Sequence, residues 1–429
     1  MWQKPFLIND YSEMEVFCVK KYSAIILANK DGSHLHSRFP AALAEVLFQP
    51  LVLWTVDCCR QMGIEDICVL TGGQKAVEDK LASEGVSIAR YVSDTASFAE
   101  AANCSEVLVL SCERPLLSSK LLKEAWEDHR IRSKIPVTTL VDEEQPCGIT
   151  WINREAFLRI MECGEQMDLY HLAQEAENND FKVMEYAVKQ TEQLRSVNSR
   201  RDLLELNKLA SDMMADRLME QGVSFTSLDG VLISPRAKVG MDTVIHAGTQ
   251  LKGNVTIGEC CQIGPNTIIE DSSIGDSTTI HSCLIEQSEV GNGVRLGPNS
   301  HLRPKSVLKD KVKIGNFVEV KNSTLGEATS VAHLTYIGDS DFGSHVNVGC
   351  GVVCVNYNGY TKARCTVGDN AFIGCNTNLV APVTVKDGAY TAAGSTITDE
   401  VPENALAIAR CRQTNKEGWA AKHRERYKK

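Results

Sequence analysis

Five polar side chains in the C-terminal half of the chain are of types that bind an anion and move a proton: Arg303, Lys321, His333, Tyr336 and Asn347. A neutral imidazole such as that of His333 accepts a proton near pH 7. Arg303 and Lys321 are 18 residues apart, and two cations held close together repel unless an anion lies between or beside them. The combination indicates an anion-binding site with a general base. Taken alone, Arg303 or Lys321 is equally compatible with an exposed wall that points into water, and His333 alone is more compatible with such a wall than with a site.

The elements that must position these residues show a strict six-residue repeat. From about residue 227, an aliphatic residue recurs at every fifth or sixth position, first at Val239, Ile245, Leu251, Ile257, Ile263 and Ile269, and later through Leu302, Leu308, Ile314 and Val320 to Ile397. Neither the helical period nor the strand period produces this spacing, whereas a hexapeptide parallel β-helix does. Each unit would form one side of a triangular coil, so that residues one coil apart lie directly over one another. Because such a coil exposes flat outer sides, we expect a closed homo-oligomer.

The repeat is interrupted once, between Val348 and Val367, by the stretch CVNYNGYTKARC. A loop inserted into a regular solenoid is more often functional than decorative. It carries Asn356, Tyr357, Lys362 and Arg364, side chains that suit an elongated ligand with phosphate groups.

The first half of the chain has a different pattern, in which apolar strands at 23–28, 66–71 and 106–111 alternate with helical segments such as 50–62 and 118–129. This alternation predicts an α/β domain with a mostly parallel sheet. A helix is expected over 200–222, ended by Gly222. The expected organisation is an α/β domain at 1–199, a connecting helix at 200–226, a β-helix at 227–405 and a basic tail at 406–429.

Composition excludes several classes of protein. A length of 429 residues suggests two or three domains, and the formal net charge of −10 argues against nucleic-acid binding as the main role. The 16 cysteines are scattered with no CxxC pair, which is typical of small buried hydrophobic residues in a reducing compartment. Met1–Asp10 contain no continuous apolar stretch and no segment reaches membrane-spanning length. We therefore expect a cytoplasmic protein.

A resemblance is carried by LRPKSVLKDKVKIGNFVEVKNSTLGEATSVAHLTYIGDSDFGSHVNVGCGVVCVNYNG, together with VAPVTV, AAGSTIT and ALAIARCRQTNKEGW. Over about residues 235–419 the chain closely resembles the bacterial bifunctional N-acetylglucosamine-1-phosphate uridyltransferase / glucosamine-1-phosphate N-acetyltransferase family. The resemblance implies a homotrimeric left-handed β-helix that transfers acetyl from acetyl-CoA to the amine of glucosamine 1-phosphate.

The same resemblance implies a role for each matching residue. His333 would be the general base, and Arg303, Lys321, Tyr336 and Asn347 would bind the sugar phosphate. The positions that match acetyl-CoA contacts are Cys350, Asn356, Tyr357, Cys375, Ala393 and Arg410, with Lys362 in a loop near the same ligand. Cys350 stands where alanine is usual and Cys375 where serine is usual, and the second exchange replaces a hydroxyl by a weaker donor.

The first half resembles the family less closely, over roughly residues 20–200. In the family, the nucleotide loop reads L-A-x-G-x-G-T-R-M and is followed by P-K. In this chain, Lys30 replaces the first glycine, His34 the arginine and Ala41 the lysine. Glycine allows backbone N–H groups to approach the phosphates closely, and the two cations neutralise a triphosphate. Without them, most of the affinity for a triphosphate is lost. Glu113 aligns with a metal-binding aspartate and Asn198 with the other metal ligand, while the segment between Val141 and Gly148 is short. We expect that the nucleotidyltransferase-like fold persists without uridyl transfer, and that Mg²⁺ is needed only if this half is active.

Three alternatives remain open on the sequence alone. The protein could be fully bifunctional, it could be a hexapeptide acyltransferase with another acceptor, or it could be a non-catalytic assembly or sensor protein. The intact set of His333, Arg303, Lys321, Tyr336 and Asn347 argues against the last of these.

Overall fold

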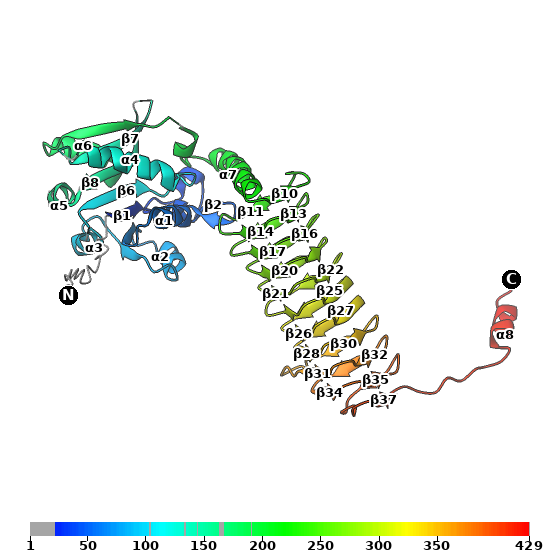
Figure 1. Cartoon of the computed structure of the whole chain (residues 1–429). Coiled ribbons are helices and arrows are strands. Elements are labelled where there is room, and N and C mark those ends of the chain that lie inside the picture. Colours follow the sequence, from blue (N-terminus) through cyan, green and yellow to red (C-terminus); the bar gives the residue numbers. More distant parts are fainter. Residues whose placement is uncertain are drawn as a thin grey trace, which may run out of the picture. The chain divides into compact units, whose positions relative to one another are not determined.

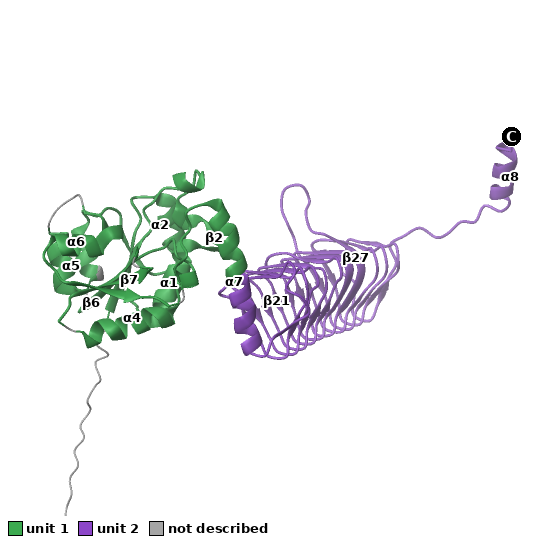
Figure 2. Ribbon diagram, turned by 90° about the horizontal axis from the view of Figure 1, so that it is seen from above, with its two compact units in different colours: residues 1–210 green, residues 211–429 purple. Residues whose placement is uncertain are grey.

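The structure, a computed structural model, describes residues 22–102, 104–132, 134–143, 145–162, 167–189 and 191–428. The expectation drawn from Met1–Asp10 lies outside these residues. The chain divides into two compact units, Met1–Ala210 and Ser211–Lys429 (Figure 2).

Unit 1 is built on one seven-stranded sheet with the strand order β5-β4-β1-β6-β8-β7-β9 (Figure 1). The four strands from β5 to β6 are parallel, β8 runs antiparallel to both β6 and β7, and β9 is parallel to β7. The strands are β1 (Tyr22–Leu27), β4 (Ile67–Leu70), β5 (Ser87–Ala89), β6 (Glu106–Ser111), β7 (Val137–Asp142), β8 (Gln145–Asn153) and β9 (Val183–Ala187), beside a small hairpin of β2 (Glu45–Val46) and β3 (Gln49–Pro50).

Helices cover both faces of this sheet because its central strands are apolar on both sides. In β1, Ala24 and Ile26 face one core, and Ile25 and Leu27 face the other. The first core is covered by α1 (Leu51–Met62), α2 (Lys75–Leu81) and α4 (Ser119–Ile131), and the second by α3 (Thr95–Ala101), α5 (Arg154–Met161) and α6 (Leu172–Asn178). Short 3₁₀ turns lie at Ser33–Leu35, Ala41–Leu43, Leu169–His171 and Thr191–Leu194. The predicted α/β class, with its strands and helices, is confirmed.

The connection between β7 and β8 is a tight hairpin. Asp142 pairs with Gln145, so only two residues join the strands. The short segment noted between Val141 and Gly148 is therefore a turn and the start of β8. The helix expected at 200–222 is α7 (Arg200–Glu220), and Gly222 follows it with φ +89°, a backbone conformation that favours glycine.

Unit 2 is a parallel β-helix of three ladders, the left-handed hexapeptide fold that the repeat predicts. Two ladders join into one sheet because β25 (Lys313–Lys321) and β27 (Ser330–Gly338) continue around a corner. The first ladder contains β10 (Ser224–Phe225), β13 (Val244–Ile245), β16 (Gln262–Ile263), β19 (Thr279–Ile280), β22 (Arg295–Leu296), β25, β27, β29 (Asn347–Val348), β32 (Phe372–Ile373), β35 (Tyr390–Thr391) and β37 (Leu406–Ala407). The second contains β11 (Leu232–Ile233), β14 (Gln250–Lys252), β17 (Ile268–Glu270), β20 (Leu284–Glu286), β23 (His301–Leu302), β25, β27, β30 (Val353–Val355), β33 (Asn378–Val380) and β36 (Thr396–Ile397).

The third ladder forms a separate sheet. It contains β12 (Lys238–Val239), β15 (Thr256–Ile257), β18 (Ser273–Ile274), β21 (Glu289–Val290), β24 (Val307–Leu308), β26 (Thr324–Leu325), β28 (Ser340–Phe342), β31 (Cys365–Val367) and β34 (Val383–Val385). The repeated aliphatic residues from Val239 to Ile397 fill the interior of the coils as one continuous core. Residues one turn apart pair in register, for example Leu302 with Val320 and Val320 with Ile337.

Beyond β37 the chain carries the short helix α8 (Trp419–Arg426), which buries no residue. Most of the described cysteines are buried, as their scatter predicts, whereas Cys260, Cys375 and Cys411 are exposed. No helix in the described ranges has the length and apolar character that crossing a bilayer requires.

Candidate active site

The candidate residues of unit 2 lie on both sides of one corner of the β-helix. Phe317 in β25 and Leu334 in β27 occupy this corner, with φ of +58° and +46°, and both side chains are largely exposed. His333 immediately precedes the corner, and Tyr336 lies on the next side of the coil. A residue with a left-handed backbone conformation in the middle of a strand thus allows that strand to present side chains on two sides of the coil.

The two predicted cations already have carboxylate partners within the chain, which corrects one step of the sequence reasoning. Arg303 Nη1 donates to Glu319 Oε1 at 2.8 Å, and Lys321 Nζ lies 3.3 Å from Asp339 Oδ2. Their proximity therefore requires no external anion. Glu319 raises the pKa of Arg303 through its hydrogen bond.

A third cation joins this pair from the inserted loop. Lys362 is close enough to Lys321 that this contact, followed by the positive charge of Lys321, lowers the pKa of Lys362, and Arg303 acts in the same direction. Three positive side chains thus converge where two carboxylates face them, and a ligand phosphate would relieve the repulsion at Lys362.

Asp339 joins the wall to the loop. The residue is buried, with 5% of its surface exposed. Asn322 Nδ2 donates to Asp339 Oδ1 at 2.6 Å, and Asn356 Nδ2 donates to Asp339 Oδ2. Burial on its own would raise the pKa of Asp339, but the hydrogen bonds from Asn322, Lys321 and Asn356 outweigh it, and the pKa is lowered.

The loop is held at its other end by Arg364. Its guanidinium makes two hydrogen bonds to the Asp341 carboxylate, at 2.9 and 2.6 Å, and a third to the backbone carbonyl of Asn322. Arg364 therefore anchors the loop to the β-helix through Asp341 and Asn322, whereas the loop composition suggested that its side chain faces a ligand.

Gly338 leaves room for two of the predicted ligand contacts. A methyl group at this position would lie 2.3 Å from the Tyr336 hydroxyl oxygen and 2.8 Å from Asn356 Nδ2. The phenol and the amide therefore meet over the bare backbone of Gly338, which pairs with Lys321 in the ladder. Tyr336, Asn356 and the cations belong to one cluster.

His333 lies in a second group, a column along the same corner. The Gly351 N–H donates to the His333 carbonyl, the Asn376 N–H to the Cys350 carbonyl and the Gly394 N–H to the Cys375 carbonyl. These bonds stack His333, Cys350, Cys375 and Ala393 on successive coils. Arg410 follows this column, since its Cδ would be 3.7 Å from a methyl group on Gly394. The imidazole of His333 is exposed, and it has no hydrogen-bond partner within the described part of the chain.

Two predicted residues are not drawn into either group. Asn347 is exposed on the first ladder, in register with Ser330 and Phe372. Tyr357 lies in the loop, where its hydroxyl donates to the Gly359 carbonyl and its backbone pairs with Lys362. Asp339 was missed, although a sequence signal existed: it directly follows Gly338, the residue that pairs with Lys321 on the next coil.

The aligned residues of unit 1 are also brought together. Glu113 is 5% exposed, and its Oε2 lies 2.5 Å from Lys30 Nζ. The Val197 N–H donates to the Glu113 backbone carbonyl, which brings the backbone before Asn198 close to that of Glu113, while Asn198 Nδ2 itself donates to Ser196 Oγ. No group of three or more metal-ligating side chains occurs in the residues that the structure covers. Mg²⁺ binds through one or two carboxylates together with water and substrate phosphates. Because the Lys30 ammonium already occupies Glu113 Oε2, the residues present do not fit the metal.

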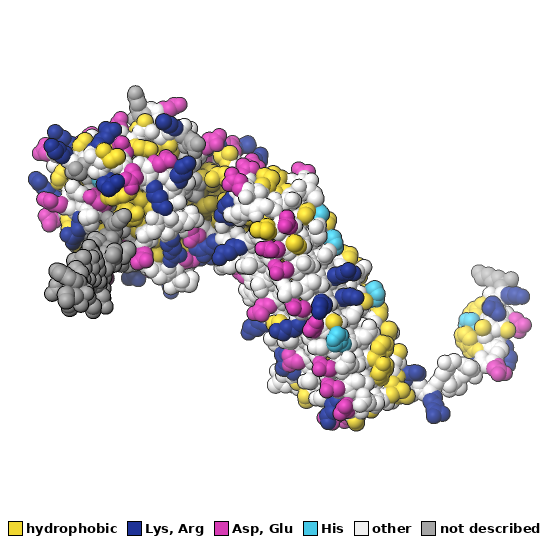
Figure 3. Space-filling view, viewed as in Figure 1, with side chains coloured by type: hydrophobic (Ala, Val, Ile, Leu, Met, Phe, Trp, Pro, Cys, Tyr) yellow, Lys and Arg dark blue, Asp and Glu magenta, His cyan; other side chains and the backbone are white. Residues whose placement is uncertain are grey.

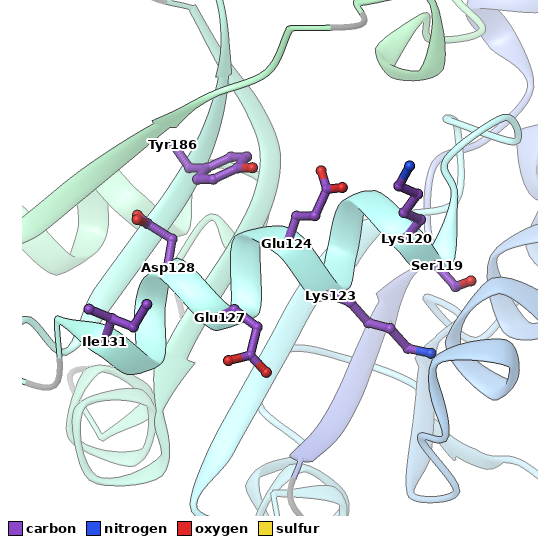
Figure 4. Close-up of a pocket in the computed structure, with 8 residues that line it drawn as sticks. All are labelled: Ser119, Lys120, Lys123, Glu124, Glu127, Asp128, Ile131 and Tyr186. Atoms are coloured by element: carbon purple, nitrogen blue, oxygen red, sulfur yellow. The ribbon is translucent and has the colours of Figure 1, made fainter.

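A groove elsewhere in unit 1 involves none of the predicted residues. It runs along α4 with a volume of about 690 Å³ and is lined by Lys120, Lys123, Glu124, Glu127, Asp128, Ser119, Ile131 and Tyr186 (Figure 4). Two lysines, Lys120 and Lys123, precede three carboxylates along α4, and these side chains point into solvent, as on an ordinary amphipathic surface helix.

The fold and these side chains define a transferase of the hexapeptide-repeat class that carries an additional α/β domain. The family model described as "Bacterial transferase hexapeptide (six repeats)" matches residues 236–271. The bifunctional protein GlmU of Geobacillus sp. (strain WCH70) is 37% identical, over 94% of this chain and 98% of its own length. Those of Halalkalibacterium halodurans and Caldanaerobacter subterraneus are 35% and 37% identical, over 93% and 95% of this chain and 98% of their own lengths. The chain belongs to the GlmU family.

Proposed function

We propose that the protein is a glucosamine-1-phosphate N-acetyltransferase that acts in the formation of UDP-N-acetylglucosamine and has lost uridyl transfer. The observation that carries the proposal is the convergence of Arg303, Lys321 and Lys362 one corner away from the unpartnered imidazole of His333. Such a site suits a substrate with a phosphate at one end and a nucleophilic amine at the other.

The proposed chemistry assigns one task to each group. The cations and Tyr336 hold the sugar phosphate, which orients the amine and lowers the entropic part of the barrier. The amine nitrogen attacks the thioester carbonyl carbon, its proton passes to His333, and the carbon–sulfur bond breaks. The coenzyme leaves as a thiolate that takes up a proton, which restores the neutral imidazole when His333 supplies it. Acetyl-CoA would lie along the column of Cys350, Cys375 and Ala393, with its phosphates near Arg410.

Self-association is part of the proposal. Exposed aromatic and aliphatic side chains stack on the first ladder, where Phe372 and Tyr390 have ring centroids 5.2 Å apart and Leu406 follows. Figure 3 shows hydrophobic side chains along this edge of the β-helix. Since soluble oligomers mostly close symmetrically, we propose a homotrimer, and sedimentation equilibrium measures the assembled mass directly.

The loss of uridyl transfer rests on Lys30, His34 and Ala41 in the nucleotide loop and on the two-residue β7–β8 hairpin. A fully bifunctional enzyme is the second candidate, because the bifunctional relatives are matched over 94% of this chain. Two assays on the full-length protein separate the candidates. Thiol release from acetyl-CoA is expected only when glucosamine 1-phosphate is present. Pyrophosphate release from UTP, Mg²⁺ and N-acetylglucosamine 1-phosphate is expected to stay at background, and an ordinary enzymatic rate would establish bifunctionality.

A further inference from the structure

The crevice at the carboxyl ends of β1 and β6 is the position where an open α/β sheet usually binds a ligand. β1 pairs in parallel with β4 on one side and β6 on the other, so the chain order reverses at β1. The loop after β1 supplies Lys30 and the loop after β6 supplies Glu113, and these two side chains meet in the crevice.

Two neighbours, Glu113 and Tyr170, hold the half-exposed side chain of Lys30 in this position. Its Nζ lies 2.5 Å from Glu113 Oε2 and 4.6 Å from the centroid of the Tyr170 ring. The Tyr170 hydroxyl donates to Asn29 Oδ1 at 2.9 Å, which fixes the ring beneath the ammonium group. An ammonium group over an aromatic face is attracted by the ring quadrupole, and a buried carboxylate requires a counter-ion.

The other oxygen of Glu113 is not satisfied by another cation. Glu113 Oε1 is buried without a hydrogen-bond partner, as is His34 Nε2, which lies 3.6 Å away. The adjacent Arg114 donates through Nε to the Cys147 carbonyl at 2.8 Å. Lys30 is therefore the permanently charged group in contact with Glu113.

We infer that the Lys30 ammonium occupies the place of a divalent cation and is the built-in counter-ion of Glu113, so that unit 1 is independent of Mg²⁺. The ammonium neutralises the charge of the carboxylate through Oε2, and a metal ion could bind Glu113 Oε2 only by displacing Lys30. Removing the ammonium leaves a buried carboxylate without a partner, which destabilises the fold until another cation binds. This inference does not require acetyl transfer, and it deepens the proposed loss of uridyl transfer by unit 1.

The test uses the full-length protein and two readouts that need no activity. The first readout is Mn²⁺ binding, followed by the electron paramagnetic resonance signal of free Mn²⁺. The second is the thermal unfolding midpoint in chelator and in MgCl₂. The variants are Lys30→Met, which keeps the length without the charge, Lys30→Arg, which keeps the charge, and Lys80→Met as a matched control at an exposed lysine of α2.

We expect no shift of the wild-type midpoint by Mg²⁺. Lys30→Met should unfold at a lower temperature in chelator and bind Mn²⁺ at least about tenfold more tightly than wild type, a difference of about 1.4 kcal/mol. The added Mn²⁺ binding should disappear in the Lys30→Met/Glu113→Gln double variant. Lys30→Arg and Lys80→Met should match wild type.

Two results would overturn the inference. One is Mn²⁺ binding by the wild-type protein that Glu113→Gln weakens, since this would mean that Glu113 already holds a metal. The other is a Lys30→Met variant indistinguishable from Lys80→Met in both readouts. The Glu113→Gln comparison is made on the wild-type background, so it remains decisive even if Lys30→Met fails to fold.

Discussion

Replacing Gly338 by alanine should impair acetyl transfer without unfolding the β-helix. The added methyl group would lie 2.3 Å from the Tyr336 hydroxyl oxygen and 2.8 Å from Asn356 Nδ2, whereas ordinary contacts begin near 3.4 Å. The hydroxyl must therefore retreat by about 1 Å. The obstructing atoms, which also include Tyr336 Cζ at 2.6 Å, all belong to side chains, so the Tyr336 ring and the Asn356 amide can move while the backbone stays in place. A misplacement of about 1 Å in a site that positions a substrate can cost about 100-fold in rate, or about 2.7 kcal/mol.

The assay is steady-state thiol release from acetyl-CoA at varied glucosamine 1-phosphate, with the unfolding midpoint measured in parallel. We expect kcat/KM for the sugar phosphate to fall between about 10- and 100-fold with little change in the midpoint. Gly315→Ala is the matched control, because its methyl group would meet the backbone carbonyl oxygen of Ala332 at 2.0 Å, and it should lower the midpoint. Wild-type kcat/KM in Gly338→Ala, or a loss of stability as large as that of Gly315→Ala, would refute the reasoning.

Three further outcomes follow from the site. His333→Ala should reduce kcat by about 10²- to 10⁴-fold with a nearly unchanged KM, as expected for removal of a general base. The control His345→Asn, at another exposed histidine, should leave kcat unchanged. An equal loss of kcat in both variants would reject the assignment of His333 as the base. Acetyl-CoA should protect the exposed Cys375 from alkylation and leave the exposed Cys260 unprotected, as measured by peptide mass spectrometry. Equal labelling of Cys375 with and without the coenzyme would contradict the placement of acetyl-CoA along this column. The pKa of Asp339 is lowered in the folded protein, so the stabilisation that its carboxylate provides is present above the unfolded value of about 3.9 and is lost as the pH falls through the folded value. Asp339→Asn should therefore destabilise the β-helix at neutral pH and make acid unfolding less steep. A variant with the wild-type acid unfolding profile would exclude Asp339 as a source of this stability.

The sequence by itself determined the β-helix and the register of its walls. One aliphatic residue in every six leaves a single way to bury them all, because each burial contributes about 1.5–3 kcal/mol and only a triangular coil aligns them inside. Once that period is known, residues one coil apart lie over one another, so the stacking of Arg303 and Lys321 could be predicted from numbering alone. The α/β class of the first half was equally predictable, since its apolar strands and amphipathic helices alternate regularly.

The tertiary structure alone decided which charged groups meet. Asp339 binds Lys321 from the next coil and Asn356 from the loop, and Lys362 reaches the same cluster from the far end of that loop. Lys30 meets Glu113 across 83 positions of the chain. The physical reason is that burial of apolar residues follows a period that a linear sequence displays, whereas ion pairing depends on loop paths and on the reach of long side chains. Those are fixed only when distant segments fold against each other.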